Sequence, residues 1–414
     1  MSDKIIFHID VNSAYLSWTA AHMLQKGCNV DIRDIPSIIG GNNDNTHGIV
    51  LAKSIPAKKF NIKTGEPVLE ALKKCPKLQI FKPDYSLYMK SSNAMYELLS
   101  NYSPLIERFS IDEVFIDASH FKNCYMQKAI EIKNKIHDEL GFNVNIGIST
   151  NKLLAKMASD LEPKNTIHTI FPDEIEEKLW SLPVDSLFMV GKATSNKLDK
   201  LNIKYIGDLA KYNKDLLISK FKSFGIKIYN YANGIDDSPI RSITRINIKG
   251  LGNSTTLTWE VTERDEAHKV LLSLIETVCM RLRANNSLCK VVAVSVKSSS
   301  FVYYSHQRTM SNYSDSTEEI YKEICIAFDE SWTGEPIRQL GVRVTKLTSN
   351  DFLQSTLFDN RNIDKMRALD ETIDNIRRKY GNSIIIRSSF LNSGIKPMNG
   401  GNGEEDYLMM SSNL

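Results

Sequence analysis

The sequence predicts a multidomain α+β protein. Strand-type and helical patterns alternate over the first 170 residues and again over residues 250–347, and a lysine-rich helical stretch lies between them. At 414 residues the chain has room for about two to four domains. Its content of 42% hydrophobic and 24% charged residues is that of a globular protein rather than a fibrous or disordered one.

The first segments predict a strand, a helix and a small mixed region. Residues 4–10 (KIIFHID) place four apolar side chains before a carboxylate, which is typical of a buried strand that ends at Asp10. Residues 11–24 suit a helix that begins near Asn12-Ser13, because both are common N-cap residue types. Residues 30–81 contain glycine- and asparagine-rich turns and predict no long element.

Clearer periodicity follows in the next stretch. Residues 110–117 (SIDEVFID) predict a pair of strands around a turn, and residues 144–148 predict a short strand. Apolar residues at helical spacing predict three helices, over residues 88–102, 126–140 and 151–161.

The second half of the chain divides into four parts. Residues 179–234 are helical in character, and residues 239–249 are polar and basic, as in a linker. Residues 250–347 carry two helical stretches between strand-type segments, in an order that suits β-α-β-β-α-β. Beyond them we expect a tail with one amphipathic segment over 363–380 and a disordered, Gly/Asn/Ser-rich end over 392–414.

Composition excludes several classes of protein. The formal net charge of +3 is too small to indicate nucleic-acid binding by itself. The six cysteines are scattered without a Cys-x-x-Cys pair, which argues against a zinc site or a disulfide framework and favours a cytoplasmic protein. No apolar run reaches about 18 residues, so we expect no membrane span. The N-terminus has no cationic stretch before an apolar run, so we expect no signal peptide.

Three acids stand at the ends of apolar segments. Asp10 closes the first strand, and Asp112 and Glu113 lie among strand-forming residues. Acids in such surroundings are costly unless they are paired, hydrated or bound to a cation. Carboxylates that met at strand ends would suit Mg²⁺. For any single acid an exposed turn is the commoner explanation, and spacing alone does not show that the three meet.

Three blocks in the first part of the chain resemble one known family. IDVNSAY (residues 9–15), SIDEVFID (110–117) and GISTNKLLAKMASD (147–160) are similar, in order and spacing, to the Y-family translesion DNA polymerases of the DNA polymerase IV and UmuC type. The resemblance extends over residues 4–347. It implies a palm with an antiparallel-rich sheet, small fingers, a helical thumb with a helix-hairpin-helix, and an α+β little finger. The implied bounds are palm 1–13 and 82–170, fingers 14–81, thumb 171–238, linker 239–249, little finger 250–348 and tail 349–414.

The resemblance also implies the chemistry. Asp10, Asp112 and Glu113 match the catalytic, metal-binding carboxylates of the family, and Val11 would add its backbone carbonyl. Two Mg²⁺ ions held there would lower the pKa of an attacking hydroxyl and neutralise a leaving pyrophosphate. The implied activity is template-directed, low-fidelity DNA synthesis from deoxynucleoside triphosphates on primer-template DNA, in damage bypass and repair. A monomer is expected.

Tyr15 matches the sugar-selecting aromatic residue of the family, with Ala14 beside it in the nucleotide site. A planar ring under the sugar leaves no room for a 2′-hydroxyl. Without the surrounding block, Tyr15 would be read as a core aromatic on a helix face.

Cations are expected around the triphosphate. Residues 50–67 resemble the finger segment of the family, with Ile55 where a tyrosine is usual and Lys58 where an arginine is usual. Lysine keeps the charge but loses the bidentate fork, so Ser54 is a further candidate. The family's Lys-Pro-Asn reads Pro-Lys-Asn here, which makes Lys164 the candidate there, whereas Lys156 suits a solvated helix face equally well.

DNA contacts are expected in the helical part and the linker. Residues 192–227 contain nine lysines and three aspartates, a local excess of six positive charges. Gly191 and Lys192 lie in a segment that resembles a helix-hairpin-helix, whose turn exposes backbone N–H groups to a phosphate. A solvated helix pair is the alternative. The linker candidates are Arg241, Arg245 and Lys249, which an ordinary polar linker would also explain.

Residues 354–359 (QSTLFD) resemble the bacterial sliding-clamp-binding peptide. Gln354, Leu357 and Phe358 would make the contact, although Ser355 stands where a leucine is usual. Two other functions stay open at this point. One is a non-catalytic accessory protein with a degenerate polymerase fold. The other is a different two-metal enzyme, such as a nuclease or a nucleotide cyclase.

Overall fold

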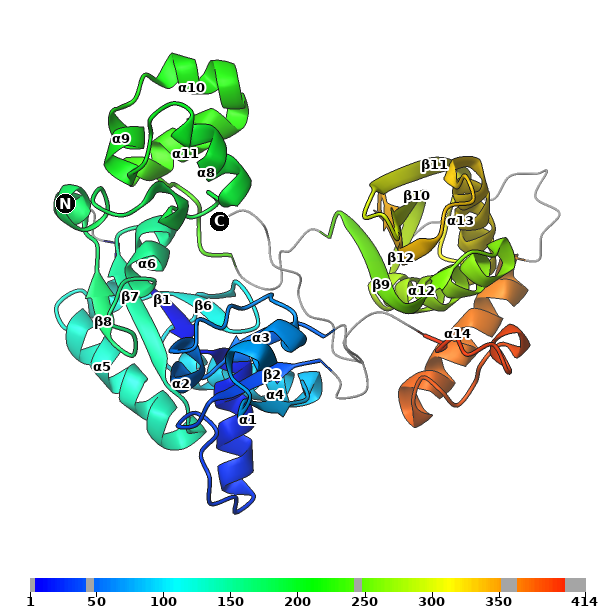
Figure 1. The fold of residues 1–414 in the computed structure, drawn as a ribbon, viewed down its shortest axis with the longest axis horizontal. Helices are drawn as coiled ribbons and strands as arrows, with labels where there is room; N and C mark the ends of the chain where they lie inside the picture. Colours follow the sequence, from blue (N-terminus) through cyan, green and yellow to red (C-terminus); the bar gives the residue numbers. More distant parts are fainter. Residues whose placement is uncertain (1–3, 42–47, 242–247, 351–362, 399–414) are drawn as a thin grey trace. The chain divides into compact units, whose positions relative to one another are not determined.

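A computed structural model describes residues 4–41, 48–241, 248–350 and 363–398 of the chain (Figure 1). The chain divides into two compact units between Ile246 and Asn247. None of the helices in the described part of the chain is long and apolar enough to cross a membrane.

A five-stranded sheet forms the centre of the first unit. Its strand order is β5-β6-β1-β7-β8, and β1 pairs antiparallel with both of its neighbours. Only β8 runs parallel to its partner, so the sheet is mainly antiparallel, as expected. The strands are β1 (Ile6–Val11), β5 (Ile106–Arg108), β6 (Glu113–Asp117), β7 (Val144–Ser149) and β8 (Ile167–Thr169).

The alternation of side chains along β1 assigns its residues to two cores. Phe7, Ile9 and Val11 lie in the core shared with three flanking helices, whereas Ile6 lies in the core on the other side of the sheet, which includes α6. Since side chains alternate along a strand, His8 and Asp10 face the same side as Ile6. The flanking helices are α1 (Ala14–Gln25), α4 (Tyr85–Ser100), α5 (Tyr125–Lys135) with a π-helical turn (Ile136–Leu140), and α6 (Lys152–Ser159).

The predicted strand pair over residues 110–117 is displaced in the structure. The first strand of the pair ends at Arg108 and the second begins at Glu113, so Ser110 and Asp112 lie in the turn between them. The backbone N–H groups of Phe109 and Ser110 both donate to the carbonyl of Glu113, at 2.9 and 3.1 Å, and close this turn.

Two smaller parts complete the first unit. A three-stranded sheet of order β3-β2-β4 has a core of its own, which includes Ile38, Val50 and Ala57. The helical character predicted for residues 179–234 is confirmed. The elements are β2 (Ser37–Gly40), β3 (Val50–Lys53), α2 (Ile55–Lys58), α3 (Val68–Lys74), β4 (Gln79–Phe81), α7 (Ile175–Lys178), α8 (Lys192–Asp199), α9 (Ile206–Lys211), α10 (Lys214–Phe221) and α11 (Ser223–Ala232).

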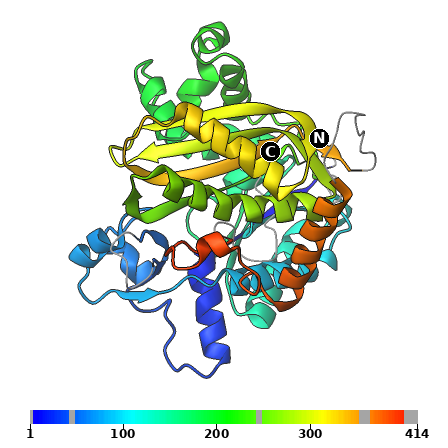
Figure 2. The same ribbon diagram turned by 90° about the vertical axis from the view of Figure 1, so that its right-hand side faces the viewer.

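The second unit has the predicted β-α-β-β-α-β order. Its sheet runs β11-β10-β12-β9, and its two helices pack along one side of that sheet (Figure 2). The elements are β9 (Gly250–Val261), α12 (Arg264–Ala284), β10 (Ser287–Ser298), β11 (Tyr303–Ser314), α13 (Thr317–Ser331), β12 (Ile337–Thr345) and β13 (Thr348–Ser349), the last of which pairs with β10.

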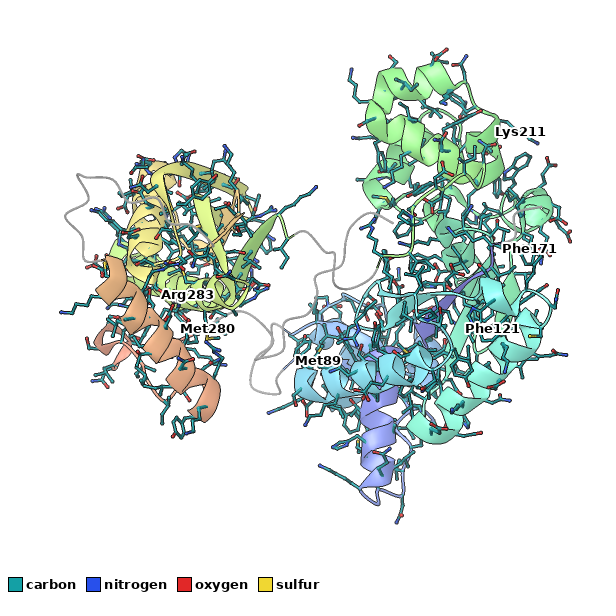
Figure 3. All side chains as sticks on the ribbon, turned by 180° about the vertical axis from the view of Figure 1, so that it is seen from behind. Met89, Phe121, Phe171, Lys211, Met280 and Arg283 are labelled. Carbon is teal, nitrogen blue, oxygen red and sulfur yellow. The ribbon has the colours of Figure 1, made fainter. Side chains whose placement is uncertain are left out.

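The amphipathic segment beyond this domain forms α14 (Ile363–Tyr380), which is docked on the second unit. Arg283, labelled in Figure 3 where α12 meets α14, donates from Nε to Asp374 Oδ2 at 2.7 Å. Phe390 and Ile395 lie in the core of the same unit. The expectation of disorder from residue 392 is therefore wrong for residues 392–398, because buried apolar side chains hold this part of the chain against the domain.

Candidate active site

The strand register brings the three predicted acids together. Asp10 stands opposite Glu113 in the antiparallel pair of β1 and β6. Asp112 precedes Glu113, and its carbonyl accepts the backbone N–H of Val11 at 3.1 Å. Acids 102 residues apart in the sequence thus meet at the end of the central strand pair.

The acids perturb one another electrostatically. Burial raises the pKa of Asp10 well above its usual value, and the charges of Glu113 and Asp112 raise it further. Burial also raises the pKa of Glu113, although Lys156 works against that rise. Paired shifts of this kind are typical of sites that bind cations or transfer protons.

Lys156 belongs to this site, so its reading as part of a solvated helix face is wrong. Its Nζ lies 2.6 Å from Glu113 Oε1, and its side chain is only 9% exposed. His8 is fully buried behind the same glutamate, with Nδ1 2.7 Å from the Ser159 hydroxyl oxygen and Nε2 3.9 Å from Glu113 Oε2. Burial lowers the pKa of His8 well below its usual value, and Lys156 and Lys152 lower it further.

The donor set suits a hard divalent cation, because Mg²⁺ prefers carboxylate oxygens. Within the described ranges, no group of three or more His, Cys, Asp or Glu side chains is already arranged to hold a metal ion. Glu113 Oε1 accepts from Lys156 Nζ at 2.6 Å, and the Ser110 hydroxyl donates to Asp112 Oδ1 at 2.5 Å.

We expect Asp10→Asn to stabilise the metal-free protein at neutral pH. A raised pKa means that the folded state binds the Asp10 proton more tightly than the unfolded state, so this group lowers stability as pH rises through the interval above its unfolded pKa. The melting temperature of the variant should exceed that of the wild type by about 2–4 °C for each kcal/mol gained. The difference should shrink as pH falls, because Asp10 then becomes neutral in both states. Asp237→Asn, at an exposed residue, is the control. A melting-temperature difference between Asp10→Asn and the wild type that does not shrink as pH falls would contradict the expectation.

Tyr15 lies at the edge of the acidic cluster. Its ring stacks on Tyr88 at 4.5 Å between centroids and 8° between planes, and the ring of Tyr85 is T-shaped to it at 6.0 Å between centroids. Burial and the nearby charge of Asp112 raise its pKa to about 12. The ring is therefore fixed in one orientation, with Ala14 buried beside it at the start of α1.

The residues predicted to contact phosphate are less closely grouped than the three acids. Ser54 is buried, and its hydroxyl caps α2 by accepting from Ala57 N at 3.1 Å while it donates to the carbonyl of Ile35 at 2.7 Å. This hydroxyl is occupied by local structure, whereas Lys58 is exposed. Lys164 Nζ donates to the carbonyl of Asp160 at 2.8 Å, on the chain that follows α6.

The chain matches known proteins over nearly its whole length. The impB/mucB/samB family model matches residues 9–160, and the C-terminal domain model of the same family matches residues 248–357. The chain is 46% identical over 392 residues to the DNA polymerase IV of Clostridium acetobutylicum, which covers 94% of this chain and 98% of that protein. The chain belongs to the Y-family of DNA polymerases, with the DNA polymerase IV proteins. The resemblance carried by the three sequence blocks is thereby confirmed.

Other members of the Y-family agree in extent and in fold. A DNA polymerase IV 2 of Bacillus subtilis is 32% identical over 401 residues, with 94% of this chain and 95% of that protein covered. A solved Y-family DNA polymerase chimera superposes with a TM-score of 0.71 at 21% identity, over 84% of this chain and 100% of the other. The predicted α+β architecture of palm, fingers, thumb and little finger is confirmed.

The DNA-contact candidates of this Y-family chain lie in different parts of it. Gly191 is the N-cap of α8, with open space where a side chain would begin, and Lys192 beside it is exposed. The backbone N–H of Arg241 donates to Glu107 Oε2 at 2.7 Å, and Lys249 is exposed in the second unit. The DNA-contact candidate Arg245 and the clamp candidates Gln354, Leu357 and Phe358 lie outside the described residues.

Proposed function

We propose that this chain extends the 3′ end of a DNA primer by two-metal phosphoryl transfer, with Asp10, Asp112 and Glu113 as the ligands of two Mg²⁺ ions. The chain is a DNA-directed DNA polymerase of the translesion type, and such polymerases depend on divalent metal ions. The observation that carries the residue assignment is the register of β1 against β6, which sets Asp10 opposite Glu113 with Asp112 next to it.

The side chains of the site supply binding, orientation and charge. The bound cations would lower the pKa of the primer hydroxyl and offset the charge of the departing pyrophosphate. Asp10, Asp112, Glu113 and the carbonyl of Val11 hold the cations. Lys156 keeps Glu113 in place from the protein side. Ser54, Lys58 and Lys164 are the proposed contacts of the triphosphate, and the Ser54 side chain also caps α2.

Primer extension on a defined template tests this function. Wild-type protein with Mg²⁺ and the four deoxynucleoside triphosphates should lengthen a labelled primer across undamaged template and across a lesion. A shortened or unchanged primer would overturn the proposal, since a nuclease gives the first result and a non-catalytic accessory protein the second.

We expect Tyr15→Ala to raise ribonucleotide incorporation by about tenfold or more, since a clash worth about 1.4 kcal/mol corresponds to that factor. The stacked Tyr88 and the T-shaped Tyr85 prevent the Tyr15 ring from turning away from a 2′-hydroxyl. The measurement is the ratio of kcat/KM for deoxy- and ribonucleoside triphosphates. Tyr96→Ala, at a half-buried tyrosine of the same helix as Tyr88, is the control. Unchanged selectivity for deoxy- over ribonucleoside triphosphates in Tyr15→Ala would contradict the sugar-selecting role of Tyr15.

The remaining assignments concern DNA, the clamp and the cell. Gly191 and Lys192 are proposed to bind phosphates at the N-terminus of α8, and Arg241, Arg245 and Lys249 are proposed to bind them along the linker. Gln354, Leu357 and Phe358 are proposed to bind the bacterial sliding clamp, which would raise the effective concentration of the enzyme at the primer end. The proposed protein is monomeric and cytoplasmic. The proposed bounds are palm 1–13 and 82–170, fingers 14–81, thumb 171–238, linker 239–249, little finger 250–348 and clamp-binding tail 349–414.

A further inference from the structure

Two buried lysines of α6 each bind a carboxylate of the β5–β6 hairpin. Lys152 and Lys156 are four residues apart, so they project from the same face of the helix. Lys156 binds Glu113 at the start of β6, and Lys152 binds Glu107 in the middle of β5. Every residue of α6 is buried. Buried ammonium groups are retained in such a place only when they are paired.

Lys156 is held between two aromatic rings. Its Nζ lies 5.3 Å from the ring centroid of Phe109 and 5.4 Å from that of Phe188. The ammonium group therefore has little freedom, and the ion pair fixes Glu113 through Oε1. Glu113 Oε2 faces His8 Nε2 at the longer distance of 3.9 Å, so this oxygen is less restrained.

The other lysine connects the hairpin to the point where the linker begins. Lys152 Nζ lies 2.9 and 2.8 Å from the two carboxylate oxygens of Glu107 and 4.9 Å from the ring centroid of Phe115. Glu107 Oε2 also accepts the backbone N–H of Arg241 at 2.7 Å. Directly before Lys152, the N-cap residue Asn151 donates from Nδ2 to the carbonyl of Gly234 at 2.8 Å. The chain that leaves α11 is thus tied to α6 and its partner at two points.

We propose that Lys152 and Lys156 are positioning residues. Lys156 fixes the catalytic carboxylate of Glu113, and Lys152, through Glu107, fixes the place where the linker leaves the first unit. The first half rests on the proposed function of Glu113, and the second half does not. The same face of one short helix then sets both the geometry of the acidic site and the root of the chain that carries the second unit.

The test of the first half is the kinetics of Lys156→Met and Lys156→Arg in single-nucleotide incorporation. We expect Lys156→Met to lower kcat by about 10- to 100-fold, as loss of a partner of a metal ligand commonly does. The KM for the nucleotide should stay within about twofold, because Lys156 holds Glu113 rather than the triphosphate. Lys156→Arg should recover part of kcat. The control is Lys178→Met, which removes a lysine paired with Glu174 at 2.5 Å elsewhere in the first unit.

A measurement without substrate supports the kinetics. In Lys156→Met, Glu113 loses the partner that orients it, so Mg²⁺ should raise the melting temperature by less than it does in the wild type. An equal rise, a wild-type kcat in Lys156→Met, or a loss that appears in KM alone would each overturn the role of Lys156. Failure of the proposed function is a different result, since the wild type itself would then not extend primers.

The test of the second half is trypsin cleavage after Arg241. The pair Glu107→Leu with Lys152→Met removes both buried charges and the acceptor of Arg241 N–H without leaving an unpaired ion. We expect the rate of cleavage after Arg241, measured by mass spectrometry, to rise about tenfold over that of the wild type. The reason is that a segment released from its anchor unfolds locally more often. Glu107→Gln, which keeps an acceptor oxygen, should fall between this variant and the wild type. Cleavage at the wild-type rate in both variants would overturn the anchoring role.

Discussion

Asp112→Ala is expected to abolish primer extension, with a loss in kcat of at least about 1,000-fold, which corresponds to roughly 4 kcal/mol of transition-state stabilisation. Asp112 lies in the β5–β6 turn, outside the hydrogen-bonded strands, with its carboxylate restrained by the Ser110 hydroxyl. Removal of the side chain therefore leaves the sheet intact while it deletes one proposed metal ligand.

The comparison for this prediction is Asp117→Asn, at the end of β6 that lies away from the turn carrying Asp112. Asp117 stands opposite Ile6, five residues from Asp112, and accepts the backbone N–H of Ser119 at 2.9 Å. Asp117→Asn should extend primers at a rate close to that of the wild type. A fully active Asp112→Ala protein, measured by single-turnover extension at saturating Mg²⁺, would show that the three acids are not the catalytic set.

Arg283→Leu is expected to destabilise the second unit by about 3–5 kcal/mol, the usual cost of leaving a buried charge without its partner. Arg283 is bound to both carboxylate oxygens of Asp374, at 2.7 and 3.0 Å, and it also donates to the carbonyl of Asp315 at 2.8 Å. Asp374 is only 2% exposed, so water cannot replace the guanidinium. The measurement is unfolding in urea, followed through the second unit.

Two further variants test whether the destabilisation comes from the charge left unpaired in the interior. Arg264→Leu removes an arginine that is 60% exposed and paired with Asp329, and such surface pairs contribute about 1 kcal/mol at most. The double variant Arg283→Leu with Asp374→Leu removes both buried charges and should recover most of the lost stability. If Arg283→Leu were no more harmful than Arg264→Leu, α14 would not depend on this pair.

Those parts of the structure that depend on local pattern could be predicted from the sequence. The β-α-β-β-α-β order of the second unit follows from apolar periodicity alone, and β1 follows from the run that ends at Asp10. The meeting of Asp10 with Glu113 needed the family resemblance, because it depends on strand register, which spacing along the chain does not contain.

Other features depend on partners that are distant in the sequence. Lys156 looks like a solvated lysine until β6 brings Glu113 against it, although the burial expected for the apolar helix around it is a signal that it needs a partner. The capping of α2 by the Ser54 hydroxyl likewise depends on the fold, while its role as a phosphate contact stays a prediction. The β5–β6 turn falls earlier than predicted, because the first strand ends at Arg108 and Glu113 already begins the second.

The docking of α14 bears on how this protein can be shortened. A chain cut after residue 357, at the end of the segment that matches the family's C-terminal domain, would lose Phe390 and Ile395 from the hydrophobic core of the second unit. It would also leave Arg283 and Glu276 without Asp374 and Arg377. Such a fragment would expose apolar core surface and leave buried charges unpaired. Aggregation or poor yield after truncation would therefore reflect a damaged fold rather than the loss of a binding peptide.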